Sequence, residues 1–223
     1  MHKSIQNLIE IKKNIKNKLL SKNIEDNIPE VIAVSKTFKI DHILPLVDFG
    51  HLHYGENKVQ EAQEKWSEVK KKNKNIKLHL VGKLQTNKVS NALKIFDYIH
   101  SLDNQKLAEK ISKLQNEYNL KPKIFIQVNI GNELQKGGIR VDEIEDFLFN
   151  CNKLNLNIIG LMCIPPINSD PEKFFLRMKF LKQKFKLADL SMGMSSDYLI
   201  ASELGSTYIR IGTNIFGQRN IKF

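Results

Sequence analysis

Cysteine is scarce in this sequence, which has only Cys151 and Cys163, and these form neither a CxxC pair nor a metal-ligand spacing. A disulfide framework is therefore not expected, and a reducing, cytoplasmic location is the default. No apolar run approaches the roughly 18 residues of a membrane span. The amino-terminal segment MHKSIQNLIEIKKNIKNKL also lacks an apolar signal core. We therefore expect a cytoplasmic protein with no metal site and no membrane contact.

The glycine-rich fingerprints of nucleotide-binding folds are missing too, because neither GxxxxGK[ST] nor GxGxxG occurs. Arginine is rare: the arginines among the 35 basic residues are Arg140, Arg177, Arg210 and Arg219. The formal charge of +11 would fit nucleic-acid binding. However, the lysine run at 70–72 has no interleaved aromatics, and arginine is the usual residue for base and phosphate recognition. We favour a lysine-rich composition with solvated helix faces, and we predict no nucleic-acid partner.

What the sequence does contain is an alternation of short apolar runs with amphipathic patterns. The runs are 31–34, 52–54, 78–81, 98–99, 124–128, 158–164, 190–192 and 208–211. Several are apolar at successive positions, which is typical of parallel strands covered on both faces. Between them, apolar residues spaced by three and four predict helices, and a further helix over about residues 4–20 precedes the first run.

Eight strands, each followed by a helix or turn, favour an α/β fold: a (β/α)8 barrel of the TIM type. A doubly wound open sheet is the competing arrangement, and the second, fourth and seventh strands are the weakest predictions. Barrels of this type commonly form one unit of about 200–250 residues, and no Gly/Ser- or Pro-rich stretch marks a linker. We expect residues 1–223 to form a single domain, with 1–24 as an extra helical segment packed on the barrel.

Functional groups of such barrels gather at the carboxyl ends of the strands, and Lys36 ends the first apolar run. A lysine at the edge of a low-dielectric core has a lowered pKa, because burial disfavours its charged form. The neutral amine can attack a carbonyl and form a Schiff base. The alternative is a lysine that extends its ammonium into solvent, and position alone favours that alternative.

Two further signals follow the last two strands. Residues 191–196 (SMGMSS) place a glycine and several serines before a short helix predicted at 197–203, whose first amides favour an anion. Gly212 and Thr213 follow the eighth strand, where barrels often build a phosphate site. Ordinary turns would explain either loop alone. Together with Lys36, the loops indicate a phosphorylated aldehyde bound at both ends, either pyridoxal 5'-phosphate (PLP) or the substrate of a sugar-phosphate aldolase.

These residues belong to a longer series of motifs. The series is AVSKT at 33–37, GENKVQE at 55–61, LVGKLQTNK at 80–88, QVNI at 127–130, ELQKGG at 133–138, GLMCI at 160–164, SMGMS at 191–195 and RIGTNIFG at 210–217. In this order the motifs closely resemble the YggS/PROSC family of pyridoxal phosphate homeostasis proteins, over nearly the whole chain from Val31 to Arg219. The resemblance implies a PLP fold-type III barrel like the N-terminal domain of alanine racemase.

The same resemblance implies a set of cofactor-binding residues. They are Lys36, Asn57, Asn129, Met194, Ser195, Arg210, Gly212 and Thr213. Lys36 would carry PLP as a Schiff base, and Ser195, Gly212 and Thr213 would bind the phosphate. Those beside the ring would be Asn57, on its hydroxyl side, together with Asn129 and Met194. Arg210 would face the pyridine nitrogen, where a permanent cation disfavours protonation and makes the ring a poorer electron sink.

The function implied is a carrier that takes up, protects and delivers PLP without turning over a metabolite, so no enzyme activity is expected. Its partners would be PLP-dependent client enzymes, and nothing requires more than a monomer. The alternative is a fold-type III amino-acid racemase, but such racemases add a C-terminal β domain that supplies a tyrosine base, and few residues follow Gly217. Lys83 departs from the family pattern. Lys136 is either a mobile second amine or a solvated loop lysine.

Some polar residues are assigned to structure rather than to chemistry. We expect His79 in the core or at the rim, Glu56 in an ion pair with a nearby lysine, and Cys163 buried. His51 and His53 flank an apolar residue, but their spacing alone does not make a metal site.

Overall fold

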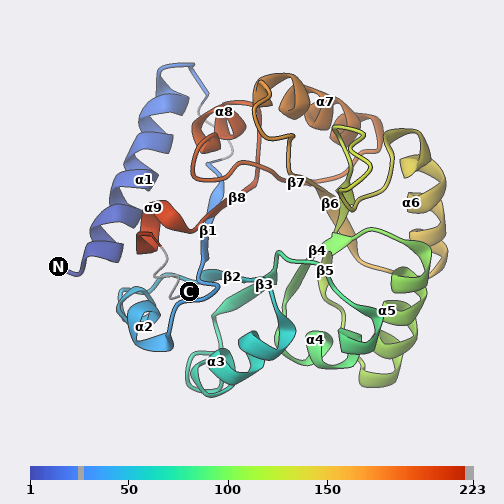
Figure 1. The fold of residues 1–223 in the computed structure, drawn as a ribbon, viewed down its shortest axis with the longest axis horizontal. Helices are drawn as coiled ribbons and strands as arrows, with labels where there is room; N and C mark the ends of the chain where they lie inside the picture. The colour runs from blue at the N-terminus through green and yellow to red at the C-terminus, as the bar shows by residue number, and fades with distance from the viewer. Residues whose placement is uncertain (25–27, 219–223) are drawn as a thin grey trace.

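The computed structural model describes residues 1–24 and 28–218. Within these residues, eight parallel strands close into a barrel in chain order (Figure 1). The strands are β1 (Glu30–Val34), β2 (His53–Glu56), β3 (Lys77–Leu80), β4 (Tyr98–Leu102), β5 (Lys123–Val128), β6 (Ile158–Cys163), β7 (Asp189–Ser191) and β8 (Tyr208–Ile211). Because β1 pairs with both β2 and β8, the sheet has no free edge. The predicted (β/α)8 barrel is confirmed, and the open-sheet alternative is wrong.

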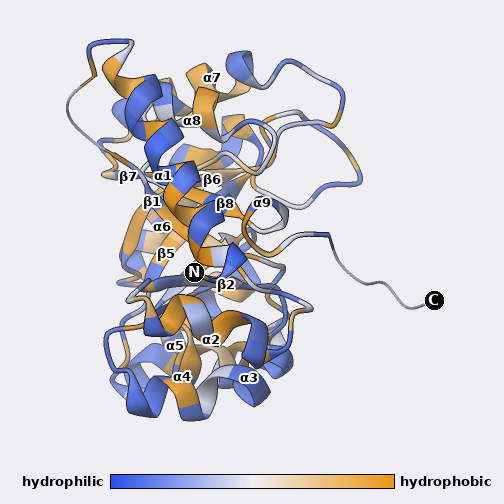
Figure 2. Cartoon of the chain, turned by 90° about the vertical axis from the view of Figure 1, so that its left-hand side faces the viewer, coloured by the Kyte–Doolittle hydropathy of each residue, from blue (hydrophilic) through white to orange (hydrophobic). Residues whose placement is uncertain are grey.

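Helices surround the barrel (Figure 1). They are α1 (Lys3–Leu20), α2 (Ile40–Asp48), α3 (Val59–Lys72), α4 (Val89–Ile95), α5 (Gln105–Tyr118), α6 (Ile144–Lys153), α7 (Pro171–Lys184), α8 (Tyr198–Glu203) and α9 (Thr213–Phe216), with short 3-10 turns η1 (Thr86–Lys88) and η2 (Val141–Glu143). Figure 2 shows polar residues gathered on the outward faces of the helices. Among the described residues, no helix combines the length and apolar character needed to cross a bilayer.

Local chemistry explains where several of these elements begin and pack. The side chain of Asp170 caps α7 by accepting the Glu172 amide, and Pro171 occupies the first helical turn, where its fixed φ and missing N–H are tolerated. On α3, Ala62 and Trp66 are fully buried, with the Trp66 ring packed 4.6 Å from the ring of Tyr54. The periodic stripes read from the sequence are therefore the faces that cover the strands.

The extra helix α1 lies on the outside of the barrel, beside α8 and α9 (Figure 1). Its buried face carries Leu8, Ile11, Ile15 and Leu19. The amide of Asn7 donates to the carbonyl of Ile215 over 2.9 Å, which ties α1 to α9. The sequence indicated only a turn where α9 forms. Arg219, at the end of the motif series, lies outside the described residues.

Candidate functional site

Lys36 lies two residues after the end of β1 and is half-buried at the carboxyl end of the barrel. The next residue, Thr37, has a left-handed backbone (φ 69°). That conformation is unfavourable for a β-branched residue and persists only where its surroundings enforce it. Here the Thr37 amide donates to Oε1 of Glu61 over 2.6 Å. A carboxylate from α3 therefore holds the peptide that follows Lys36.

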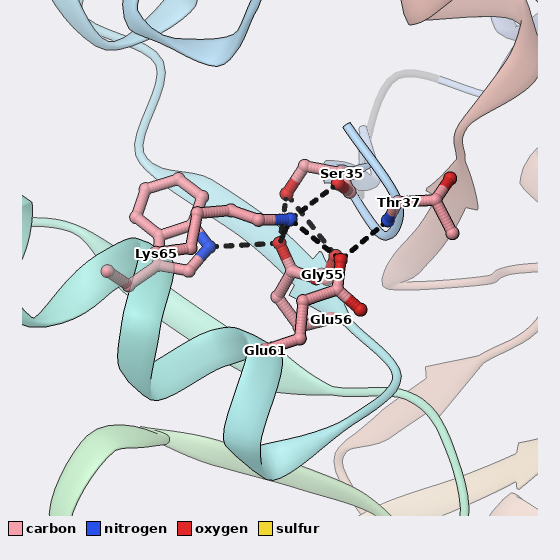
Figure 3. A network of polar contacts seen from close by, with 7 residues as sticks. Ser35, Thr37, Gly55, Glu56, Glu61 and Lys65 are labelled. Atoms are coloured by element: carbon pink, nitrogen blue, oxygen red, sulfur yellow. Dashed lines mark hydrogen bonds and ion pairs between the residues drawn. The ribbon is translucent and has the colours of Figure 1, made fainter. Parts of the chain in front are cut away.

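Glu56, at the end of β2, organises the other side of this turn (Figure 3). Its buried Oε1 accepts hydrogen bonds from Ser35 Oγ at 2.7 Å, Lys65 Nζ at 2.8 Å and Trp66 Nε1 at 2.9 Å. Burial raises the pKa of Glu56, and the Lys65 ammonium and the other two donors oppose that rise. The predicted pairing of Glu56 with a lysine is confirmed.

Lys65 connects the two carboxylates to the backbone before Lys36. Its ammonium donates to the Ser35 carbonyl over 2.9 Å and to Glu61 Oε1 over 3.0 Å, in addition to Glu56. The carbonyl before Lys36 and the amide after it are thus both fixed by side chains from α3 (Figure 3). This anchorage positions the lysine backbone through charge and hydrogen bonds.

Arg210 on β8 is buried, with 6% of its surface exposed. Its Nη1 donates to Ser191 Oγ over 2.7 Å, and its Nη2 donates to the carbonyl of Cys163 over 2.8 Å. Burial lowers the pKa of Arg210, but a guanidinium stays protonated because its ordinary pKa is so high. Cys163 is buried as predicted, and burial raises the pKa of its thiol to about 12. The barrel interior therefore holds a permanent cation that joins β6, β7 and β8.

The loop after β7 depends on a glycine. Gly193 has φ +92°, and a Cβ there would lie 2.5 Å from the Cβ of Ala201 and 3.0 Å from Ile209 Cγ2. The Met194 amide donates to Asp197 Oδ1 over 2.6 Å. Among the described residues, no protein acceptor meets the following two amides, at positions 195 and 196. These N–H groups are thus available to an anion.

The loops after β7 and β8 are joined to each other and to β1. The side chain of Asn214 donates to the Ser195 carbonyl over 2.9 Å. A Cβ added to Gly212 would lie 3.1 Å from the carbonyl oxygen of Val34, two residues before Lys36. Thr213 is exposed and begins α9. The three segments singled out in the sequence are therefore neighbours at one end of the barrel.

The remaining predicted site residues lie at the same rim. Asn57 follows β2, and its backbone is in close contact with Gly82, where a Cβ would lie 2.8 Å from Asn57 Cα. Met194 is half-buried. Asn129 follows β5, and its side chain bonds the loop after it: Nδ2 donates to the carbonyl of Glu133 at 2.9 Å, and Oδ1 accepts the Glu133 amide at 3.0 Å. Asn129 therefore shapes this loop.

Lys136 is neither a freely mobile amine nor a fully solvated one. Its ammonium pairs with Glu133 at 2.6 Å and donates to the Pro165 carbonyl over 3.1 Å, which links the loops after β5 and β6. Lys83 is exposed. Within residues 1–24 and 28–218, no group of three His, Cys, Asp or Glu side chains is arranged to hold a metal ion.

The expected core position of His79 is confirmed by its full burial, but sequence reasoning missed its hydrogen bonds to His53 and His100 and the anchorage by Glu61 and Lys65. The four-residue spacing of Glu61 and Lys65 could have predicted an ion pair on one helix face. It could not have shown that the pair reaches the backbone around Lys36.

The fold and the rim residues define the class: an α/β barrel with a lysine after its first strand and glycine-containing loops after its last two strands. Residues 7–220 match the family model described as alanine racemase, N-terminal domain. The chain belongs to this family and, within it, to the pyridoxal phosphate homeostasis proteins.

Relatives of that name are similar along most of their length. The protein from Aquifex aeolicus is 35% identical over 204 residues, covering 87% of this chain and 89% of the relative. The protein from Pasteurella multocida is 34% identical over 226 residues, covering 96% and 97%. The structure of PipY from Synechococcus elongatus with PLP bound is 34% identical, with a TM-score of 0.78, and covers 91% of this chain and 100% of PipY.

A more distant likeness concerns the fold alone. Alanine racemase from Clostridium difficile 630 has a TM-score of 0.74 at 16% identity, covering 99% of this chain and 57% of the racemase.

Proposed function

We propose that this chain binds PLP and serves in its homeostasis as a carrier, without turning over a metabolite. The observation that carries the proposal is the anchored backbone around Lys36, at the rim that also holds the loops after β7 and β8. The names of the relatives and the PLP bound to PipY support it.

The residues at the rim fit the chemical groups of PLP. When bound, the cofactor supplies an aldehyde that condenses with a primary amine, and Lys36 supplies that amine. The amide at Ser195 has no acceptor among the described protein groups, and with Gly212 and Thr213 it would bind the phosphate. The residues that would border the ring are Asn57, Asn129 and Met194. Gly212 suits phosphate binding because the absence of a side chain lets another group approach its backbone closely.

Arg210 supports a carrier rather than a catalyst. Its buried guanidinium would stand beside the pyridine nitrogen and keep that nitrogen unprotonated, because two like charges at close range repel. A ring that is not protonated withdraws electrons weakly, so it stabilises a carbanion poorly. The chain would then hold the cofactor without activating a bound amino acid.

The wider assignment follows from the same proposal. Residues 1–223 would form one PLP-binding barrel domain, with 1–24 packed on its side. It would act as a monomer that passes PLP to PLP-dependent enzymes. The free buried thiols of Cys151 and Cys163 fit a cytoplasmic setting.

The proposal is tested by loading the purified chain with PLP, recording its visible absorbance, reducing it with borohydride and mapping the tagged lysine by mass spectrometry. The tag is expected on Lys36. Lys36→Ala should lose the reducible adduct and keep weak, phosphate-driven binding, whereas Lys83→Ala at the same rim should behave as wild type. A tag of equal yield in Lys36→Ala, for example on Lys136, would show that another lysine is the anchor.

The likeness to alanine racemase makes racemisation the alternative function. The loaded protein should leave L-alanine and L-serine unchanged in a chiral assay. Racemisation at an ordinary enzymatic rate would replace the carrier assignment.

A further inference from the structure

A continuous chain of polar side chains runs through the barrel beneath the candidate site. Arg210 Nη1 donates to Ser191 Oγ, and Ser191 Oγ lies 2.8 Å from His100 Nδ1. His100 Nε2 lies 2.9 Å from His79 Nδ1, and His79 Nε2 lies 2.9 Å from His53 Nδ1. The contact between Ser191 and His100 joins β7 to β4, which are not neighbours in the sheet, so the chain crosses the interior of the barrel.

The histidine rings at the centre of this row of polar side chains are buried and held in place by aromatic neighbours. His79 stacks on Tyr98 at 4.1 Å with an interplanar angle of 16°, and His100 stacks on Phe125 at 4.4 Å and 20°. Both histidines and Ser191 have no exposed surface, whereas His53 is half-buried at the start of β2. Only the His53 end therefore meets solvent, and the ring positions are set by packing as well as by hydrogen bonds.

Arg210 sets the donor-to-acceptor direction of the hydrogen bonds along this row of polar side chains. A guanidinium has donors only, so Ser191 Oγ must accept from it. Among the described residues Ser191 Oγ has two partners, Arg210 and His100, so its own hydrogen has an acceptor only if it points at His100 Nδ1. His100 then carries its proton on Nε2 and donates to His79.

The same logic passes along the remaining rings. His79 accepts at Nδ1, so as a neutral ring it carries its proton on Nε2 and donates to Nδ1 of His53, which is then protonated on Nε2 as well. The reverse arrangement would bury the Ser191 hydroxyl hydrogen without an acceptor, which is unfavourable. Burial lowers the pKa of His79 and His100, which keeps both rings neutral.

We propose that Ser191, His100, His79 and His53 are one positioning relay, directed by Arg210, that fixes the guanidinium in a single orientation below the mouth of the barrel. The relay itself stands on the protein's own hydrogen bonds. The role of the relay toward the cofactor, which is to orient Arg210 toward the ring nitrogen, rests on the proposed function.

Imidazole nitrogen shifts in a long-range 1H–15N spectrum report the tautomer of each histidine and test this proposal on the full-length protein. In the wild type, His53, His79 and His100 should all be protonated on Nε2. Ser191→Ala removes the donor to His100 and should give mixed tautomers along the relay as far as His53. A wild-type spectrum with Nδ1-protonated rings would overturn the proposal without any variant.

Ser206→Ala is the matched control, because Ser206 is an equally buried serine whose hydroxyl bonds only backbone groups among the described residues: three carbonyls and the amide of Met192. It should leave all three tautomers unchanged. His51, which bonds the backbone of His53 rather than its ring, is an internal control in every spectrum. Equal changes in the Ser206→Ala and Ser191→Ala proteins would reduce the effect to a general loosening of the barrel and reject the relay.

A second pair of variants tests the direction. Arg210→Gln replaces a pure donor by a group that can donate or accept, and should mix the tautomers. Arg210→Lys keeps a pure donor and should preserve them. Unchanged tautomers in both Arg210→Gln and Ser191→Ala would overturn the relay. The measurement is made before and after PLP is added, so a failed relay is distinguishable from a failure of Lys36 to bind the cofactor.

Discussion

The two sides of the barrel mouth are built by different means. On the amine side, which comprises residues 35–37 with Glu56, Glu61 and Lys65, charged side chains of α3 hold the backbone, and Glu56 of β2 pairs with Lys65. On the anion side, which comprises residues 191–197 and 210–214, a buried arginine, backbone bonds and close-packed glycines set the geometry. The amine side should therefore be sensitive to loss of charge, and the anion side to added volume and to protonation of His100, which contacts its Ser191.

The largest expected effect is acid destabilisation through the buried histidines. Burial lowers the pKa of His51 to about 4 and lowers those of His79 and His100. Below their unfolded pKa of about 6.5, the unfolded chain takes up protons that the folded chain refuses, so stability falls as the pH falls. At pH 5.5 each histidine should lower the free energy of unfolding by slightly more than 1 kcal/mol, so three should lower it by about 4 kcal/mol.

Urea unfolding at pH 7.5 and pH 5.5 measures this loss. His79→Gln should remove about a third of it, since one titrating ring is gone. His42→Asn, at an exposed position, should leave the loss unchanged. A free energy of unfolding that is the same at both pH values would mean that the buried rings take up protons in the fold as readily as in the unfolded chain.

The next largest effect concerns added side-chain volume on the anion side. Gly193→Ala adds a methyl group against Ala201 and Ile209 at a left-handed position, and should destabilise the protein by about 3 kcal/mol. Gly205→Ala has nearly the same backbone angle, φ +87°, with nothing within 4 Å of the added Cβ, and should cost about 1 kcal/mol. Thermal unfolding of the two variants separates crowding from backbone strain, and equal losses would refute the packing role of Gly193.

The smallest of these effects concerns charge on the amine side. Glu56→Ala leaves the nearly buried Lys65 ammonium with Glu61 as its remaining carboxylate. We expect a loss of about 2 kcal/mol, below the usual penalty for a buried ion whose partner is removed, because one partner remains. Glu68→Ala breaks the exposed pair with Lys71 and should change stability by less than about 0.5 kcal/mol. Similar losses of stability in the Glu56→Ala and Glu68→Ala proteins would mean that the Lys65 ammonium is exposed to solvent.

Much of the fold follows from local patterns. The eight apolar runs coincide with β1 to β8, because strands covered on both faces are apolar at successive positions. The pair Asp170 and Pro171 coincides with the start of α7. The rim placement of Lys36 and Gly212 followed from strand order, since parallel strands end at one edge. The contact between Ser191 and His100 could not be predicted. It spans the barrel interior, and its register depends on strand tilt and stagger rather than on spacing along the chain.

Barrel closure has a consequence for synthesis. Lys36 follows the first strand, yet that strand completes its pairing only against β8, where Ala33 is in register with Ile211. A nascent chain emerging from the ribosome therefore exposes the lysine long before the segment that must close beside it exists. The segments of the proposed cofactor site can come together only when translation has almost finished, so a truncated product would carry Lys36 without the proposed phosphate-binding loops.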